Sequence, residues 1–351
     1  MVEWKKLGDI CNIKTGKGIT QEYCSEEHLF PVISGGQTPM GYYSEYNRNE
    51  NTVTVSRVGA NAGYVSYLTE KFYLNDKCFS VIPHNQSINS KFLFFYLKDR
   101  EGEIRTLQSE GGVPTINTQK LGKITFPIPL LTEQKRIVGI LDTFTASIEN
   151  LKEQIAQRRK QYEYYRDQLL DLEGKEGVEM KTLGEVCTVI TGGEVPDDTI
   201  KGQLFPSPEY PYAVYTNGKE TYGFTKTYQV DSDAVCISSI GANTGAIFYK
   251  VGKFTPAIRL KVLIPKKMLN TKFLYYAASI IDFRGKNTGS VPNINANYVK
   301  SKEIPVPPLS EQQRIVSILD TFEASIANLE AQLSQREKQY EYYRNKLLTF
   351  E

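Results

Sequence analysis

The sequence is poor in the residues that metal sites and many catalytic centres use. Two histidines, His28 and His84, occur in 351 residues, so histidine-based metal or triad chemistry is not expected. The five cysteines form no Cys-x-x-Cys pair, and their odd number and wide spacing argue against a disulfide framework or a zinc site. This pattern is typical of a reducing cytoplasm. The cysteines are Cys11, Cys24, Cys78, Cys187 and Cys236.

Signals for membranes and for common catalytic sites are missing too. No run of about 18 apolar residues is present, and the start MVEWKKLGDI has no apolar core of the kind a secretion signal needs. KTGKG (14–18) lacks the upstream Gly and the following Ser/Thr of a phosphate-binding loop. No Gly-rich dinucleotide turn occurs, and no Asn-Pro-Pro-Tyr or Asp-Pro-Pro-Tyr stretch of the kind used on a flipped base. Asp171, Glu173 and Lys175 resemble a nuclease set only loosely, in the linker DLEGKEG. The sequence therefore predicts no membrane association and no catalytic centre.

Charge of one sign does not dominate either. The 42 basic and 40 acidic residues give a net charge of +2. Residues 1–130 hold 14 basic against 13 acidic side chains and residues 179–308 hold 15 against 11, so the remaining stretches are mildly acidic. This balance permits nucleic-acid binding without demanding it, because many DNA readers gather charge on one face of a near-neutral domain.

What the sequence does have is an internal repeat. Residues 133–173 and 311–351 are identical at 28 of 41 positions, with an offset of 178. Weaker matches precede each copy: LGDICNIKTG with LGEVCTVITG, SRVGANAG with SSIGANTG, GGVPTIN with GSVPNIN, and FPIPLL with IPVPPL. The repeat predicts the order domain, helix, domain, helix. The predicted segments are a domain at 1–130, a long helix at 131–173, a linker at 174–180, a second domain at 181–308 and a second long helix at 309–351.

The two domains carry mixed signals of the α+β class. Short apolar runs predict strands, and two longer runs predict helices. The aromatic run Phe92 to Tyr96 is expected in the core rather than as a stacking platform. The predicted strands are 51–58, 63–68, 78–83, 233–240 and 260–265, and the predicted helices are 91–100 and 272–280.

The two long segments follow an unbroken four-three heptad pattern, which is typical of a coiled-coil seam. Their starts are marked by Thr132 and by Ser310 with Gln313, which suggests a capping box. About 40 residues at 1.5 Å each give helices of roughly 60 Å. The predicted seam contains Ile137, Leu141, Phe144, Ile148, Leu151, Ile155, Tyr162, Ile315, Leu319, Phe322, Ile326, Leu329, Leu333 and Tyr340.

The polar exceptions in the seam, Arg158 and Arg336, indicate the direction of pairing. A parallel pair in register would set the two arginines against each other, whereas an antiparallel pair sets each against an apolar position with its head free to reach the rim. We therefore expect an antiparallel coiled coil within one chain, with pseudo-two-fold symmetry. Dimerisation between chains is the alternative, which the internal duplication disfavours.

The loops of the two domains share a frame but differ in chemistry. SGGQTPMGYY (34–43) aligns with TNGKETYGFT (216–225), and in the GAN loops Arg57 faces Ser239. Arginine suits guanine, glutamine and asparagine suit adenine, and lysine suits guanine or phosphate; ordinary solvated loop residues are the alternative. The candidate DNA contacts are Ser34, Gln37, Tyr43, Arg57, Asn61, Lys77, Thr216, Asn217, Lys219, Ser239, Asn243 and Arg259.

Two variable domains, each followed by a helix opening Leu-Thr/Ser-Glu-Gln-x-Arg-Ile-Val-x-Ile-Leu-Asp, resemble the specificity subunits of type I restriction–modification enzymes. The resemblance covers the whole chain and is strongest at Glu133–Phe144, Glu311–Phe322, Tyr162–Arg166 and Tyr340–Arg344. It implies two target recognition domains that each read one half of a bipartite double-stranded DNA site, with the helices fixing the gap. It also implies two methyltransferase (modification) subunits that bring S-adenosylmethionine, and restriction subunits that add ATP-driven, Mg²⁺-dependent translocation. No cofactor is expected in this chain.

Two other functions stay open at this point. A self-contained DNA-modifying enzyme would turn over DNA as the lone chain with S-adenosylmethionine or magnesium. A coiled-coil scaffold that binds only proteins would bind no duplex DNA even with a methyltransferase partner.

Because DNA advances about 34 Å per turn, helices of roughly 60 Å could seat two unlike domains about a turn apart. The favoured target is therefore two short, unequal half-sites with a fixed gap.

Overall fold

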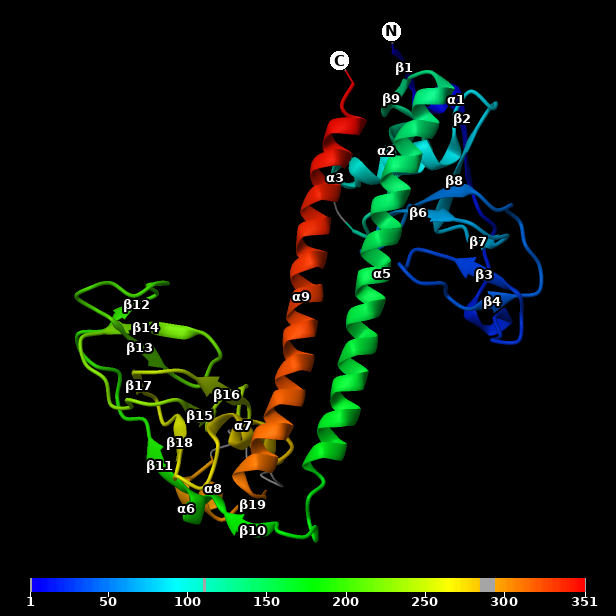
Figure 1. Ribbon diagram of the computed structural model, residues 1–351. Helices are drawn as coiled ribbons and strands as arrows, with labels where there is room; N and C mark the ends of the chain where they lie inside the picture. The colour runs from blue at the N-terminus through cyan, green and yellow to red at the C-terminus, as the bar shows by residue number, and fades with distance from the viewer. Residues whose placement is uncertain (1, 110–111, 285–293, 351) are drawn as a thin grey trace. The chain divides into compact units, whose positions relative to one another are not determined.

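The computed structural model describes residues 2–109, 112–284 and 294–350 (Figure 1). The chain forms two compact units, the first made of residues 1–152 and 331–351 and the second of residues 153–330. Each of the two long helices therefore contributes a part to each unit. Among the residues described, no helix is long and apolar enough to cross a membrane.

The first unit is built on an antiparallel sheet in the order β2-β8-β5-β6. Val53, Val55 and Val81 on one face of this sheet belong to the same buried core as α2. A second sheet, β4-β3-β7, contains a parallel pair, and β1 pairs with β9. Its elements are β1 (Glu3–Lys6), α1 (Leu7–Ile10), β2 (Cys11–Thr15), η1 (Gln21–Tyr23), β3 (Phe30–Ile33), β4 (Tyr42–Tyr43), β5 (Thr52–Ser56), β6 (Val65–Leu68), β7 (Tyr73–Leu74), β8 (Cys78–Pro83), α2 (Ser90–Asp99), α3 (Glu101–Thr106), α4 (Thr118–Gly122) and β9 (Thr125–Ile128).

The second unit repeats this plan. Its main sheet has the order β11-β18-β15-β16, the second sheet has the order β12-β14-β13-β17 with β13 parallel to β17, and β10 pairs with β19. The strand β12 has no counterpart in the first unit's second sheet, β4-β3-β7. Its elements are β10 (Glu179–Thr182), α6 (Leu183–Val186), β11 (Cys187–Thr191), β12 (Ile200–Lys201), β13 (Tyr212–Tyr215), β14 (Thr221–Thr225), β15 (Ala234–Ile237), β16 (Ile247–Lys250), β17 (Phe254–Pro256), β18 (Lys261–Pro265), α7 (Thr271–Ser279), α8 (Ala296–Lys300) and β19 (Glu303–Val306).

The α+β class and the predicted elements are confirmed. The five predicted strands are β5, β6, β8, β15 and β18, and the two predicted helices are α2 and α7. Each of these helices begins after an asparagine whose side chain caps it: Asn89 accepts from the amides of Lys91 and Phe92, and Asn270 caps α7 in the same way. Phe92, Phe95 and Tyr96 are buried, so the aromatic run lies in the core as predicted.

The long helices α5 (Leu131–Leu170) and α9 (Leu309–Leu348) begin one residue before the predicted caps. The prediction that Thr132 and Ser310 cap these helices is wrong, because both residues lie in the first turn. The amides of Glu133 and Gln134 bond to the carbonyl of Leu130, and the second helix starts in the same way on Pro308. α5 also ends three residues earlier than expected, at Leu170.

A buried glutamine locks each helix start to its globular unit. Gln134 is fully buried; its Oε1 accepts from the Asn89 amide at 2.8 Å, and its Nε2 donates to the carbonyls of Ser87 and Pro129. Gln312 makes the same three bonds, to the Asn270 amide and to the carbonyls of Met268 and Pro307. All polar atoms of these amide groups meet matched partners, so the joint is fixed in direction.

Ion pairs complete both joints. Lys91 on α2 reaches Asp142 on α5 at 2.9 Å, and Lys272 on α7 reaches Asp320 on α9 at 3.4 Å. Tyr276 also donates to Asp320 at 2.5 Å, and burial together with this bond raises the pKa of its hydroxyl. The Glu-Gln-x-Arg-Ile-Val-x-Ile-Leu-Asp sequence therefore serves to join a helix to a sheet domain.

Within each unit the two helices run in opposite directions, as predicted (Figure 1). In the first unit Phe144 of α5 stacks on Tyr343 of α9, with ring centroids 5.3 Å apart. In the second unit Tyr165 of α5 stacks on Phe322 of α9 at 5.4 Å. The two contacts use equivalent positions of the repeat, because Phe322 corresponds to Phe144 and Tyr343 to Tyr165 at the offset of 178.

The seam arginines behave as the antiparallel prediction requires. The Arg336 guanidinium lies over the Phe144 ring at 5.6 Å, and Arg158 lies over Phe322 at 5.8 Å. Each charge therefore meets an aromatic face rather than the other arginine. The fourteen predicted seam residues are all buried or half-buried. Ion pairs Lys152–Glu337 and Arg159–Glu330 flank the seam in the first and second unit respectively.

Candidate nucleic-acid interface

Three loops meet at one end of the main sheet in the first unit. The loop after β3 holds Ser34 and Gly35, the loop after β5 holds Arg57, and the turn before β8 holds Lys77. A Cβ on Gly35 would lie 2.9 Å from the Val58 carbonyl, so the first two loops touch through a position that only glycine fits. The Cys78 thiol donates to the Ser34 carbonyl at 2.8 Å and closes the cluster.

Arg57 is half-buried in this cluster. Its Nη1 donates to the Asp76 carbonyl at 3.1 Å, and the guanidinium lies over the Phe79 ring at 5.6 Å. Its Nε is buried without a partner among the described residues. Lys77 is exposed, and so is Gln37 in the loop after β3. The cluster therefore offers two cations and an amide within one group of loops.

The second unit brings the equivalent loops together around Asn217. The Asn217 Oδ1 accepts from the Ser239 amide at 2.7 Å, its Nδ2 donates to the Ile258 carbonyl, and its own carbonyl accepts from Asn243 at 3.2 Å. Asn217 thus ties three loops that lie far apart in sequence. Its amide is committed to the fold, and the exposed polar groups here are Lys219, Asn243 and Arg259.

The remaining candidates fall into buried and partly exposed groups. Ser34 is 9% exposed and Ser239 is fully buried, with the Ser239 hydroxyl donating to the Arg259 carbonyl at 2.6 Å, so both hold loops in place. Tyr43 lies on β4 and packs edge-on against Tyr73. Asn61 and Thr216 are half-buried in the same loops as the exposed candidates.

Two residues near this site were not among the sequence candidates. Lys250 of β16 is nearly buried; its ammonium donates to the Lys219 carbonyl at 2.6 Å and lies 3.8 Å from the Tyr215 ring centroid. Burial lowers its pKa. Leu68 holds the matching position of β6, so the change from Leu to Lys was a signal visible in the aligned copies. The second residue missed by the sequence candidates is Ile258, which lies on an exposed turn.

The cysteine thiols are not poised as nucleophiles. All five cysteines are free. Burial raises the pKa of Cys78 to about 11 and that of Cys236 to about 12, so both stay protonated at neutral pH.

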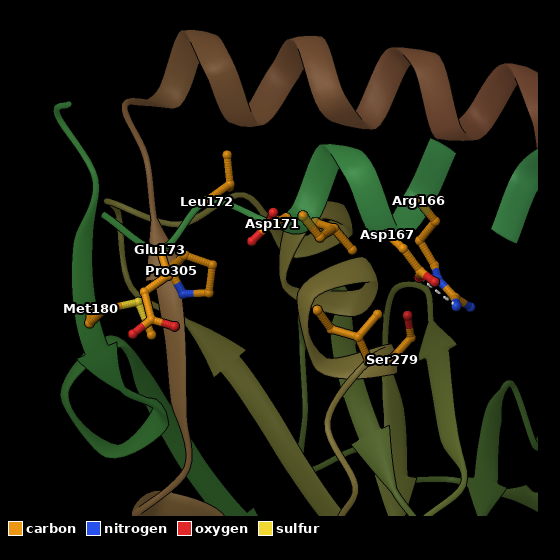
Figure 2. Close-up of a pocket in the computed structure, with 10 residues that line it drawn as sticks. Arg166, Asp167, Asp171, Leu172, Glu173, Met180, Ser279 and Pro305 are labelled. Atoms are coloured by element: carbon orange, nitrogen blue, oxygen red, sulfur yellow. Dashed lines mark hydrogen bonds and ion pairs between the residues drawn. The ribbon is translucent and has the colours of Figure 1, made fainter. Parts of the chain in front are cut away.

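A pocket of about 610 Å³ lies where α5 ends in the second unit (Figure 2). It contains the acidic residues of the DLEGKEG linker that loosely suggested a nuclease. Figure 2 shows Asp167 paired with Arg166, Asp171 further along and Glu173 beside Pro305 and Met180. No group of three or more metal-ligating side chains occurs in the part of the chain that is described. Asp171 and Glu173 are therefore not part of such a group.

A shallow groove of about 810 Å³ runs along the helix pair in the second unit. Its walls are the exposed rings of Tyr164 and Tyr165 and the ring of Phe322, with Arg158 and Arg314 at its edges. In the first unit the equivalent tyrosines, Tyr342 and Tyr343, are exposed as well. The repeated Tyr-Glu-Tyr-Tyr-Arg sequence therefore places an aromatic surface on the helices of each unit.

The comparisons with known proteins agree with this architecture. Residues 1–158 and 175–337 match the family described as type I restriction modification DNA specificity domain. A Mycoplasma pneumoniae chain described as a type I specificity subunit is 30% identical over 97% of this chain and 96% of its own length. The Escherichia coli EcoR124I/EcoR124II specificity subunit is 30% identical over 99% and 94%.

Solved structures show the same fold. The crystal structure of a type I restriction–modification S subunit from M. genitalium superposes with a TM-score of 0.76 at 19% identity, covering 100% of this chain and 97% of that one. A chain from a study of complex assembly in a type I system gives a TM-score of 0.58 at 18% identity, covering 99% and 96%. The chain belongs to the type I restriction–modification specificity family.

Proposed function

We propose that this chain selects the DNA sequence for a type I modification complex, with each unit reading one half of a bipartite, asymmetric site. The observation that carries the proposal is the pair of equivalent loop clusters on one repeated scaffold. The frame is retained in both, while Arg57 in the first cluster is replaced by Ser239 in the second, and Gln37 by Lys219. Two domains that recognise different bases need different hydrogen-bonding side chains at equivalent loop positions.

The paired helices are proposed to set the gap between the half-sites. α5 and α9 each have 40 residues, which is roughly 60 Å of helix at 1.5 Å per residue. The glutamine and ion-pair joints fix the direction in which each helix leaves its sheet domain. A rigid spacer with fixed joints converts helix length into base pairs at about 34 Å per turn of DNA.

The aromatic surfaces on the helices are the proposed docking sites for two methyltransferase subunits. The side chains of Tyr164 and Tyr342 are 62% and 59% exposed. Tyrosine is enriched at protein–protein interfaces, where a partner buries its ring. One equivalent surface in each unit matches two copies of one partner. In this proposal the chain has no reaction of its own; the partners bring S-adenosylmethionine, and a restriction subunit would add ATP-driven cleavage.

The reading function is tested by mapping methylated positions in DNA from cells that express the chain with its methyltransferase partner. Two short unequal blocks separated by a gap of fixed length are expected. A continuous block, a palindrome or the absence of any motif would contradict the proposal. Turnover by the lone chain with S-adenosylmethionine would instead support a stand-alone enzyme.

Docking is tested by the mass of the purified complex. Tyr164→Ser should remove one methyltransferase copy, and the double variant Tyr164→Ser, Tyr342→Ser should remove both, because each exposed ring would be buried by one partner. Tyr23→Ser, at an exposed tyrosine away from the helices, is the matched control. Full assembly of the double variant would exclude these surfaces as docking sites.

A further inference from the structure

The turn between β17 and β18 has an unusual backbone. Ile258 and Arg259 have φ angles of 51° and 60°, and the Leu260 amide donates to the Ala257 carbonyl at 3.2 Å. Two successive positive φ angles are the pattern of a type I′ turn, which asparagine and glycine usually occupy. A β-branched residue is rarely found there, because its side chain crowds the backbone in this region.

The surrounding loops hold this disfavoured conformation. The Ile258 and Arg259 amides donate to the carbonyls of Gly193 and Gly192 at 2.7 and 3.0 Å. The Ile258 carbonyl accepts from Asn217, and the Arg259 carbonyl accepts from Ser239 at 2.6 Å. The amides and carbonyls of both residues therefore have partners, in the segment that follows β11 and in the loops that hold Asn217 and Ser239. Strain that the rest of a fold maintains in this way is common at ligand-binding positions.

The first unit does not share this feature. Asp76 and Lys77 occupy the equivalent turn, and neither has a positive φ. The Arg57 guanidinium, which bonds to the Asp76 carbonyl, supplies a second cation there. The second unit has Ser239 in place of Arg57, so its cluster presents a different set of groups from the same frame.

The strained turn presents one apolar and one cationic side chain. Ile258 is 39% exposed and lines a mainly apolar pocket of about 490 Å³. Val195, Ile240 and Arg259 line the same pocket, together with one carboxylate, that of Glu194. In the major groove of unmodified DNA the thymine C5-methyl is the apolar group that base edges offer, and arginine bonds guanine O6 and N7 in bidentate fashion.

We infer that the Ile258–Arg259 turn is the specificity-determining contact of the second unit, with Ile258, Val195 and Ile240 receiving a thymine methyl group and Arg259 bonding a nearby guanine. This inference rests on the proposed function, since it assigns the bases that the second cluster reads. It requires that the second half-site contain both a thymine and a guanine.

The test uses the full methyltransferase complex with Ile258→Asn and Arg259→Lys. Asparagine tolerates positive φ, so the turn is kept while the apolar group is removed, and the melting temperature should not fall. Ile258→Asn should reduce the preference for thymine at one position of the second half-site by about fivefold or more, with the first half-site and the gap unchanged. Arg259→Lys should relax the nearby guanine. Ile280→Asn, at an exposed isoleucine outside the cluster, is the matched control.

A methyl-deleted target sharpens the test. Replacing that thymidine with deoxyuridine should weaken binding of the wild-type complex about fourfold, which is the effect of burying one methyl group. The same replacement should leave binding by Ile258→Asn unchanged. If the wild-type complex methylates a bipartite motif but Ile258→Asn alters nothing in it, the inference is overturned while the proposed function stands. If the wild-type complex shows no bipartite motif, the proposed function itself fails.

Discussion

The two units differ least where their helices join the sheets and most where their loops meet. Gln134 and Gln312 make matched sets of hydrogen bonds, and Phe144–Tyr343 and Phe322–Tyr165 stack at nearly equal distances. In the loop clusters, by contrast, one unit presents Arg57 and the other a strained turn. The joint makes the same contacts in both copies, whereas under the proposed function the loops recognise different bases.

The comparison also separates two kinds of polar residue. In the joints, the buried amides of Gln134 and Gln312 meet partners within the fold, and replacing either glutamine leaves buried groups unpaired. In the clusters, exposed groups such as Lys77, Lys219 and Arg259 lie at loop tips, where replacement costs the fold little. A duplicated chain can therefore change its target without rebuilding its scaffold.

The largest expected effect comes from breaking a joint. Gln312→Ala leaves the Asn270 amide and the carbonyls of Met268 and Pro307 without their buried partner, which should cost about 2–4 kcal/mol of unfolding free energy. Gln134→Ala should cost a similar amount, because it makes the equivalent bonds. Urea unfolding measures both, with the exposed neighbour Gln313→Ala as control. A loss below about 0.5 kcal/mol in either variant would show that the joint is not locked by these amides.

Changing the helix length tests the spacer. One heptad inserted into 151–165 together with one in 329–343 adds about 10 Å and should lengthen the gap by about 3 base pairs. Both half-sites should keep their sequences, because the loop clusters are untouched. Methylation mapping reads the gap directly. An unchanged gap would reject the helices as the spacer.

Arg57→Ala sharpens the contrast between the clusters. If Arg57 bonds a base edge, one position of the first half-site should lose about 1–3 kcal/mol of discrimination while the second half-site stays intact. Lys71→Ala removes an exposed cation of the same unit outside the cluster and should leave the motif alone. Equal weakening on all sequences would identify Arg57 as a phosphate contact instead.

The smallest effect concerns acid stability. Burial alone would raise the pKa of Glu101, but its bonds to Lys98, Arg105 and the Val65 amide hold that pKa below 4.5. A carboxylate with a depressed folded-state pKa contributes stability above its unfolded pKa and loses it as pH falls. Glu101→Gln should therefore cost roughly 1 kcal/mol at pH 7 and less below pH 4. Melting curves at several pH values measure this, and a pH-independent loss would mean a packing effect.

The sequence was sufficient for the helices and for the plan of the domains. Heptads from Ile137 and Ile315 predicted the seam, and Arg158 and Arg336 predicted its direction, because a charged side chain in a seam has few acceptable partners. Strands such as Cys78–Pro83 followed from apolar runs. The predicted caps Thr132 and Ser310 were wrong. Both lie inside the first helical turn, where Gln134 and Gln312 hold the helix starts through bonds to distant segments.

The loop clusters were only partly predictable. Aligning the two copies identified loops that do meet, because repeated frames place equivalent loops together. The alignment could not show that Ser239 and Asn217 face inward, since a polar residue in a loop has the same sequence signal whether it bonds to the fold or to solvent.

The duplication, the two α+β bodies and the two heptad helices can all be read from the amino-acid sequence, because periodicity and repetition are local properties of the chain. Which polar groups are left to face a ligand depends on the folded structure. That choice depends on hydrogen bonds between loops far apart in sequence, as when Asn217 and Ser239 hold Ile258 and Arg259 in a conformation that neither residue would adopt alone.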